Sequence, residues 1–217
     1  MNFEKARYNM IEQQIRTWDV LDEHVLDLFR DVPRENFVPS AFQQLAYSDI
    51  AIPLPHEQCM LPPREDARIL QMLKPKATDN VLEIGTGTGF LTLLLSKMCH
   101  HVLTVDIYPE FTDNAKKNLD AFNLKNVSFA TFDASQSLPH PAVYDVICVT
   151  GSLAEMPSFL MNQLNISGRI FAIVGNAPAM HATCMTRVAD NQWITETLFE
   201  TVRPRLVNAD KSKSFEF

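Results

Sequence analysis

The sequence is poor in the features that mark secreted and membrane proteins. It has only four cysteines, scattered as Cys59, Cys99, Cys148 and Cys184, with no Cys-x-x-Cys pair among them. Such spacing is typical of reduced thiols and offers no disulfide framework. The N-terminal residues MNFEKARYNM contain no apolar signal-peptide core, and no apolar run reaches the ~18 residues that cross a bilayer. We therefore expect a cytoplasmic protein with no membrane partner.

The sequence also has fewer basic than acidic residues. The chain has 19 Lys and Arg residues against 26 Asp and Glu, which gives a formal net charge of −7. Because no basic field is available to attract phosphates, we expect no nucleic-acid partner. A His-Glu-x-x-His motif and a Cys/His cluster are both missing, so we expect no metal site. The absence of a Gly-x-Ser-x-Gly elbow argues against a serine hydrolase.

What the chain does contain is a regular alternation of strand and helix patterns. Strands are expected at residues 80–84, 101–106, 127–133, 144–150 and 169–175, and helices at residues 64–73, 89–99, 109–122 and 156–164. This alternation predicts an α/β fold with a doubly wound, mostly parallel sheet. Extended stretches at 182–188 and 193–203 predict a C-terminal antiparallel hairpin at the sheet edge. Helical periodicity over residues 3–30, broken near Trp18, adds N-terminal helices.

Residues 83–89 read Glu-Ile-Gly-Thr-Gly-Thr-Gly, directly after an apolar strand pattern. Opening turns of this kind bind ligands at the carboxyl ends of parallel strands. A dinucleotide fingerprint would need glycine at position 90, where the chain has Phe90. No Gly-Lys-Ser/Thr follows either, so the turn is not a nucleotide phosphate loop. The spacing therefore disfavours both a dinucleotide and a nucleoside triphosphate.

Three acids accompany the glycine turn. Glu83 precedes the first glycine, and Asp106 and Asp133 close the next two expected strands. A carboxylate at the second strand end accepts hydrogen bonds from ribose hydroxyls, one at the third can receive an adenine amino group, and Glu83 favours a cationic end of the ligand. Any one of these acids alone could be a solvated loop residue or a helix cap. Together they predict a cationic adenosyl ligand.

The glycine turn with Asp106 and Asp133 resembles the class I S-adenosylmethionine-dependent methyltransferases, which have a Rossmann-like fold. The rest of the chain resembles one family among them, the protein-L-isoaspartate O-methyltransferases. The similar stretches are MIEQQIR (10–16), VPRENFVP (32–39), LAYSDIAIPLP (45–55), VLEIGTGTGFLTLLLS (81–96), YDVICVT (144–150) and VGNAP (174–178). They cover most of residues 5–175, and the VPRENFVP block is far more specific than the glycine turn.

The resemblance implies an enzyme that uses S-adenosyl-L-methionine and releases S-adenosyl-L-homocysteine. Its substrate would be the carboxylate of an isoaspartyl residue in damaged protein or peptide, and the ester formed would cyclise and reopen to repair the backbone. Residues 64–217 would form the methyltransferase domain, and residues 1–63 an N-terminal helical and substrate-side segment. The expected cofactor-binding residues are Glu83, Gly85, Thr86, Gly87, Thr88, Gly89, Asp106, Ile107, Asp133 and Ala134.

The substrate side departs from the family pattern, which carries a Gln-Thr-Ile-Ser-Gln-Pro-type motif. Here Gln58 is kept, but the threonine is Cys59 and the serine is Leu61. Leucine offers no hydrogen bond to an incoming carboxylate. The candidate substrate-side residues are Gln58, Leu61 and Thr150. The departure leaves open another carboxylate or small-molecule acceptor, or a non-catalytic cofactor-binding module.

Two further features stay open on sequence alone. His56 and Glu57 fall near the expected acceptor mouth, where they are either an acid/base pair or ordinary loop residues. An ionised carboxylate acceptor needs no proton removal, which favours the loop interpretation. The tail, PRLVNADKSKSFEF, also differs from the family's usual closing strand.

Overall fold

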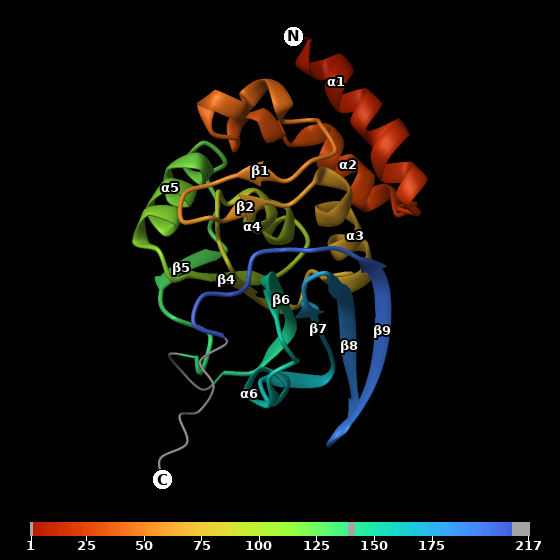
Figure 1. Cartoon of the computed structure of the whole chain (residues 1–217), viewed down its shortest axis with the longest axis vertical. Coiled ribbons are helices and arrows are strands. Elements are labelled where there is room, and N and C mark those ends of the chain that lie inside the picture. Colours follow the sequence, from red (N-terminus) through yellow and green to blue (C-terminus); the bar gives the residue numbers. More distant parts are fainter. Residues whose placement is uncertain (1, 139–141, 210–217) are drawn as a thin grey trace.

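The computed structural model describes residues 2–138 and 142–209 and shows a mixed sheet with helices on both faces (Figure 1). Residues 210–217 of the divergent tail lie outside the described residues. The seven strands run in the order β5-β4-β3-β6-β7-β8-β9. The first five positions are parallel, and β8 and β9 pair antiparallel. The predicted α/β fold and its C-terminal antiparallel hairpin are confirmed.

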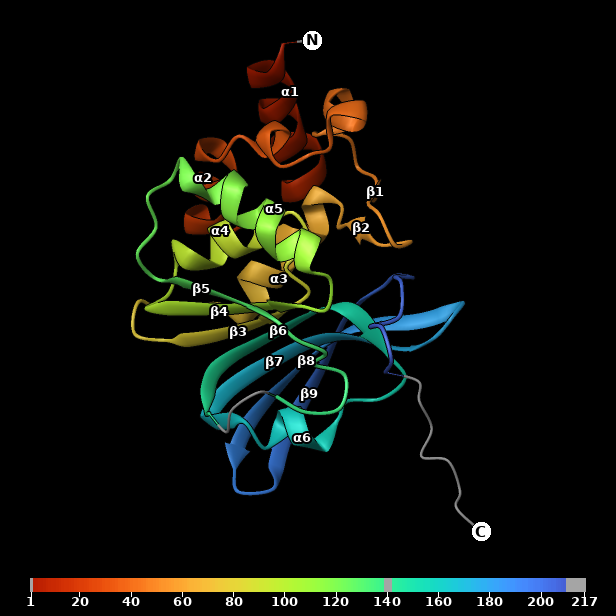
Figure 2. The ribbon, with the colours of Figure 1, turned by 90° about the vertical axis from the view of Figure 1, so that its left-hand side faces the viewer.

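The strands of the sheet are β3 (Asn80–Ile84), β4 (His101–Asp106), β5 (Val127–Thr131), β6 (Tyr144–Leu153), β7 (Leu164–Asn176), β8 (Ala179–Ala189) and β9 (Gln192–Glu200). The helices are α1 (Phe3–Met10), α2 (Glu23–Asp31), α3 (Pro63–Leu73), α4 (Phe90–Ser96), α5 (Pro109–Asp120) and α6 (Ser158–Met161). Figure 2 shows α2 to α5 on one face of the sheet and α6 on the other. Central strands are buried on both faces, as Val81 and Leu82 show with 0% exposure each.

The N-terminal helices follow the predicted pattern. A π-helical turn (Ile11–Ile15) and a 3-10 turn (Arg16–Trp18) continue α1, and the chain reverses at Asp19, which has a φ of 57°. The Asp22 side chain accepts a hydrogen bond from the His24 amide at 3.0 Å and caps α2. Two further 3-10 turns follow the prolines, at Arg34–Asn36 and Ser40–Leu45.

Two predicted elements differ in the structure. The helix expected at 156–164 is only four residues long, because Leu164 already pairs with Tyr144 as the first residue of β7. The strand expected at 193–203 ends at Glu200. The Thr201 amide still bonds to the Met180 carbonyl of β8, and the chain then continues to Ser152 of β6. The irregular stretch 47–63 also contains a short antiparallel hairpin of β1 (Ile52–Pro53) and β2 (Cys59–Met60). The division into units at residue 63 stays a prediction.

Arg34, from the VPRENFVP block, is a buried cation that joins three segments. It is 1% exposed, and its guanidinium donates to the Asp66 carboxylate (2.7 Å), the Leu61 carbonyl (2.5 Å) and the Ala46 carbonyl (3.0 Å). The Phe90 ring lies 4.6 Å from its guanidinium carbon. Burial raises the pKa of Asp66 to about 7, although Arg34 opposes the shift. The arginine therefore ties the segment before α3 to α3 itself.

We expect Arg34→Ala to lower the free energy of unfolding by about 3–5 kcal/mol, because the substitution leaves the buried Asp66 carboxylate without its cationic partner. Urea denaturation followed by circular dichroism measures the change. The matched control is Arg16→Ala. Arg16 pairs with Glu12 and Glu23, which are more exposed than Asp66, so the urea denaturation midpoint of this variant should stay close to that of the wild type. Equal midpoints for the two variants would contradict this role for Arg34.

Candidate active site

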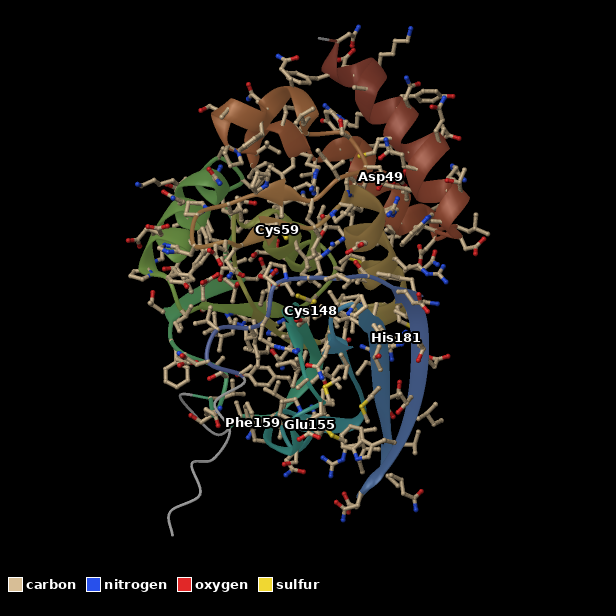
Figure 3. All side chains as sticks on the ribbon, in the orientation of Figure 1. Asp49, Cys59, Cys148, Glu155, Phe159 and His181 are labelled. Carbon is tan, nitrogen blue, oxygen red and sulfur yellow. The ribbon has the colours of Figure 1, made fainter. Side chains whose placement is uncertain are left out.

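A pocket opens where β3, β4 and β6 end, at the edge of the sheet facing the β1–β2 hairpin. The sequence-predicted residues that line it are Gln58, Leu61, Glu83, Gly85, Thr86, Gly87, Thr88, Asp106, Ile107, Asp133, Ala134 and Thr150. Further lining residues that the sequence did not single out are Leu54, Met60, Asp66, Phe90, Tyr108, Phe111, Phe132, Leu206 and Val207. Figure 3 shows Cys59 on the hairpin side of the sheet and Cys148 on β6. The structure therefore brings all the predicted site residues except Gly89 to one pocket.

Gly89 is the predicted residue that serves the fold rather than the wall of the pocket. A Cβ on it would lie 3.0 Å from the Cβ of Ala115 in α5, and its φ of 83° favours glycine. Gly85 faces a different neighbour. A Cβ there would lie 2.1 Å from Thr150 Oγ1, which donates hydrogen bonds to the Ile84 and Gly85 carbonyls at 3.2 and 3.0 Å. Thr150 thus holds the turn from the end of β6.

Glu83 is fully buried at the base of the pocket, with 0% exposure. Its Oε2 accepts hydrogen bonds from Thr92 at 2.5 Å and Thr104 at 2.7 Å. Its Oε1 has no hydrogen-bond partner among the described residues. Burial raises the pKa of Glu83 to about 8, against the two threonine hydrogen bonds, with Asp66 adding to the rise. A cationic group entering here would meet an acceptor with a free oxygen.

Asp106 closes β4 and shapes the glycine turn. Its two oxygens accept hydrogen bonds from the Gly87 amide at 3.0 Å and the Tyr108 amide at 3.1 Å. Burial raises the pKa of Asp106, while these amide donors oppose the rise. Beside it, Thr86 Oγ1 bonds to Thr104 Oγ1 at 2.7 Å, which links the turn to β4. The carboxylate therefore lies against both the turn and the loop that carries Ile107.

Asp133 lies two residues beyond the end of β5, which stops at Thr131 rather than at Asp133 as predicted. One of its oxygens accepts from the Ser135 amide at 3.0 Å, and the other accepts from the Asn208 side-chain amide at 2.7 Å. Asn208 comes from the C-terminal segment, which also supplies Leu206 and Val207 to the pocket wall. Sequence patterns missed this contribution, because the segment lies outside any regular element.

Two of the three candidate substrate-side residues, Gln58 and Leu61, lie on and after the β1–β2 hairpin, whereas Thr150 lies on β6. Leu61 is 6% exposed, and its carbonyl is held by Arg34, so the side chain is fixed at the pocket. The Gln58 side chain donates to the His56 carbonyl at 3.0 Å and stabilises the hairpin turn. Burial raises the pKa of the Cys59 thiol, which keeps it protonated. The hairpin thus presents apolar and neutral groups to the pocket.

His56 attaches the hairpin tip to the start of α5. Its ring stacks on Tyr108, with centroids 3.8 Å apart and planes at 7°, and its Nε2 lies 2.8 Å from Glu110 Oε1. This position agrees with the loop interpretation of His56 and Glu57. Both have a positive φ, 56° and 58°, as the tight hairpin requires.

The charged residues that line the pocket, within the described part of the chain, are all acids: Asp66, Glu83, Asp106 and Asp133. Among the described residues there is no group of three His, Cys, Asp or Glu side chains able to hold a metal ion. Over the same part of the chain, no helix is long and apolar enough to cross a membrane. The lining suits a cationic ligand, and Glu83 Oε1, which has no hydrogen-bond partner among the described residues, is an available acceptor.

The sequence is similar to those of known methyltransferases. The model of the protein-L-isoaspartate(D-aspartate) O-methyltransferase family matches residues 5–208. A protein-L-isoaspartate O-methyltransferase of Methanoculleus marisnigri is 36% identical over 171 residues, 79% of this chain and 78% of that protein. One of Koribacter versatilis is 34% identical over 185 residues, 85% of this chain and 83% of the relative.

Solved structures show the same fold. A Plasmodium falciparum protein described as a putative protein-L-isoaspartate O-methyltransferase in complex with S-adenosyl-L-homocysteine has a TM-score of 0.77 at 17% identity. The match covers 95% of this chain and 98% of that one. A second protein-L-isoaspartate O-methyltransferase has a TM-score of 0.78 at 23% identity, over 94% of this chain and 66% of the other. The chain therefore belongs to the protein-L-isoaspartate(D-aspartate) O-methyltransferase family, whose members are S-adenosylmethionine-dependent methyltransferases.

Proposed function

We propose that the protein transfers the methyl group of S-adenosylmethionine to the carboxylate of isoaspartyl residues in damaged proteins or peptides. The observation that carries the proposal is the pocket at the glycine turn, which is lined by acids, among them Glu83, whose Oε1 has no hydrogen-bond partner among the described residues. Repair of the backbone would follow when the methyl ester cyclises and reopens. We place this activity in the cytoplasm, in keeping with four cysteines that are all unpaired.

The proposed cofactor site uses the residues of three strand ends. The turn of Gly85, Thr86, Gly87 and Thr88 would approach the donor closely, with Gly89 setting the packing of the helix behind it. Asp106 and Ile107 would contact the ribose and its surroundings, and Asp133 and Ala134 the adenine. Glu83 would face the cationic amino acid end. These assignments follow from the placement of the residues at the ends of successive strands.

When bound, the cofactor supplies an electrophilic methyl group on a sulfonium. Transfer would break the S–CH₃ bond, form an O–CH₃ bond at the acceptor and leave S-adenosylhomocysteine, with no proton to remove from an ionised carboxylate. The chain's own contribution is therefore positioning and the exclusion of water. Leu54, Met60 and Leu61 form the apolar wall on the hairpin side, and the His56–Tyr108 stack holds that hairpin against α5.

A second candidate function is favoured by Leu61. With leucine where the family pattern has a serine, the acceptor side offers no hydroxyl at that position. Another carboxylate, a small-molecule acceptor, or cofactor binding without catalysis would all suit an apolar wall there. Methyl transfer to an isoaspartyl peptide distinguishes these cases from the proposed activity.

We expect Glu83→Gln to weaken binding of S-adenosylmethionine about fivefold or more beyond its effect on S-adenosylhomocysteine, because the former carries a sulfonium charge in addition to the ammonium charge that both ligands share. Isothermal titration calorimetry with both ligands measures the difference. Glu110→Gln is the control, since that carboxylate pairs with His56 outside the base of the pocket. An equal loss for both ligands would remove Glu83 from any role at the sulfonium.

We expect the wild type to methylate isoaspartyl peptides only weakly and Leu61→Ser, alone or with Cys59→Thr, to raise the rate. One positioned hydrogen-bond donor in a catalytic site commonly contributes ~10²–10³ in rate. Transfer of radiolabelled methyl to an isoaspartyl peptide and to its aspartyl twin measures both rate and selectivity. Leu54→Ser is the matched control, because it adds a hydroxyl elsewhere on the same wall.

The outcomes of this assay separate the alternatives. Selective transfer to the isoaspartyl peptide, whether fast or slow, supports the proposed function. Strong selective transfer by the wild type would show that Leu61 does not limit the reaction. No transfer to either peptide, even with Leu61→Ser, would contradict isoaspartyl methylation and leave another acceptor or a binding module.

A further inference from the structure

The C-terminal segment of residues 201–209 is a fixed part of the site. Figure 1 shows it leaving the end of β9 and crossing back over β6. At its start, Thr201 and Arg203 both donate to the buried Glu65 carboxylate, at 3.0 Å each. In the middle, Ser152 of β6 donates its amide to the Pro204 carbonyl and accepts from the Leu206 amide, each at 2.9 Å. The segment is therefore held at several points along its length.

The sheet makes room for this segment at Gly151. A Cβ on that residue would lie 3.2 Å from the Cα and 3.3 Å from the Cβ of Leu206, closer than side chains normally pack. The glycine lets Leu206 and Val207 reach the pocket wall. The segment and the end of β6 are thus shaped for each other, and the chain beyond Val207 is brought to the side of the pocket where Asp133 lies.

Asn208 then meets Asp133. The Ala209 amide bonds to the Leu206 carbonyl at 3.0 Å, which closes a turn with Asn208 at its third position and a φ of 64°. Asparagine tolerates this left-handed conformation better than most residues. The Asn208 side chain donates to Asp133 Oδ2 at 2.7 Å, and its carbonyl accepts from Gln136 Nε2 at 3.4 Å. Both its side chain and its backbone are bound to the loop after β5.

This hydrogen bond has a direct consequence for the carboxylate. An ionised Asp133 can only accept, so the amide nitrogen of Asn208 must be the group that faces it. The Ser135 amide binds the other oxygen, so the plane of the carboxylate is fixed by a donor on each side.

We propose that Asn208 is a positioning residue for adenine recognition: it holds the Asp133 carboxylate so that this group accepts the exocyclic amino group of the cofactor. The inference rests on the proposed placement of adenine at Asp133. It assigns to the C-terminal segment a part in distinguishing adenine from a purine that lacks the amino group.

The test compares S-adenosylhomocysteine with S-inosylhomocysteine, in which a carbonyl oxygen replaces the amino group. Wild-type protein should bind the adenosyl ligand more tightly, because the inosyl oxygen would face the Asp133 carboxylate. Asn208→Ala should weaken binding of the adenosyl ligand about tenfold, because an Asp133 carboxylate that is no longer held in place loses its charge-assisted hydrogen bond to the amino group of adenine. Binding of the inosyl ligand, which lacks this amino group, should stay nearly unchanged. Isothermal titration calorimetry gives both affinities, and thermal unfolding of each ligand-free variant checks the fold.

Asn176→Ala is the matched control. Its side chain accepts from Arg205 at 2.6 Å, so it removes an asparagine amide that binds the same segment but not Asp133. The proposal requires Asn176→Ala to keep the wild-type preference for adenine. An unchanged preference in Asn208→Ala, or the same loss in both variants, would overturn it. Failure of the wild type to bind S-adenosylhomocysteine would instead contradict the proposed cofactor site.

Discussion

The buried ion pair of Arg34 and Asp66 connects the parts of the molecule on which the site depends. One guanidinium binds a carboxylate of α3 and two backbone carbonyls, those of Ala46 and Leu61. Because a buried charge without its partner is costly, these segments are held together as one unit. The Leu61 carbonyl is therefore held by an arginine 27 residues earlier in the chain, and the same contact fixes the end of the β1–β2 hairpin that precedes Leu61.

The pocket that results combines contributions of different physical character. The sheet supplies acids and close backbone approach, the hairpin supplies an apolar wall, and the C-terminal segment supplies Asn208 and two apolar side chains. Burial keeps Glu83 largely neutral near pH 7, since its pKa is about 8. A cation entering the pocket would favour the ionised form and gain an acceptor whose Oε1 has no other partner among the described residues. Charge on the ligand and charge on the protein are thus coupled.

Local patterns predicted the strands, the glycine turn and the acids, because each depends on neighbours within a few residues. The helix expected at 156–164 was predicted too long, since pairing of Leu164 with Tyr144 overrides helical periodicity at its end. The part played by the C-terminal segment was missed for a similar reason: Asn208 reaches Asp133 across 75 residues of sequence. The network of Arg34, Leu61 and Asp66 also depends on long-range contacts. Arg34 lies in the VPRENFVP block, but no spacing rule indicates its partners.

The central claim is that this acid-lined pocket binds a cationic methyl donor at Glu83. Calorimetric titration of the protein with S-adenosylmethionine at about pH 6.5, in buffers of different ionisation enthalpy, tests it most directly. At this pH Glu83 is protonated and the ligand's amino group is charged, so binding should ionise Glu83 and release up to about one proton per ligand. The observed enthalpy should then vary linearly with the buffer's ionisation enthalpy. Binding without any dependence on the buffer would contradict the claim.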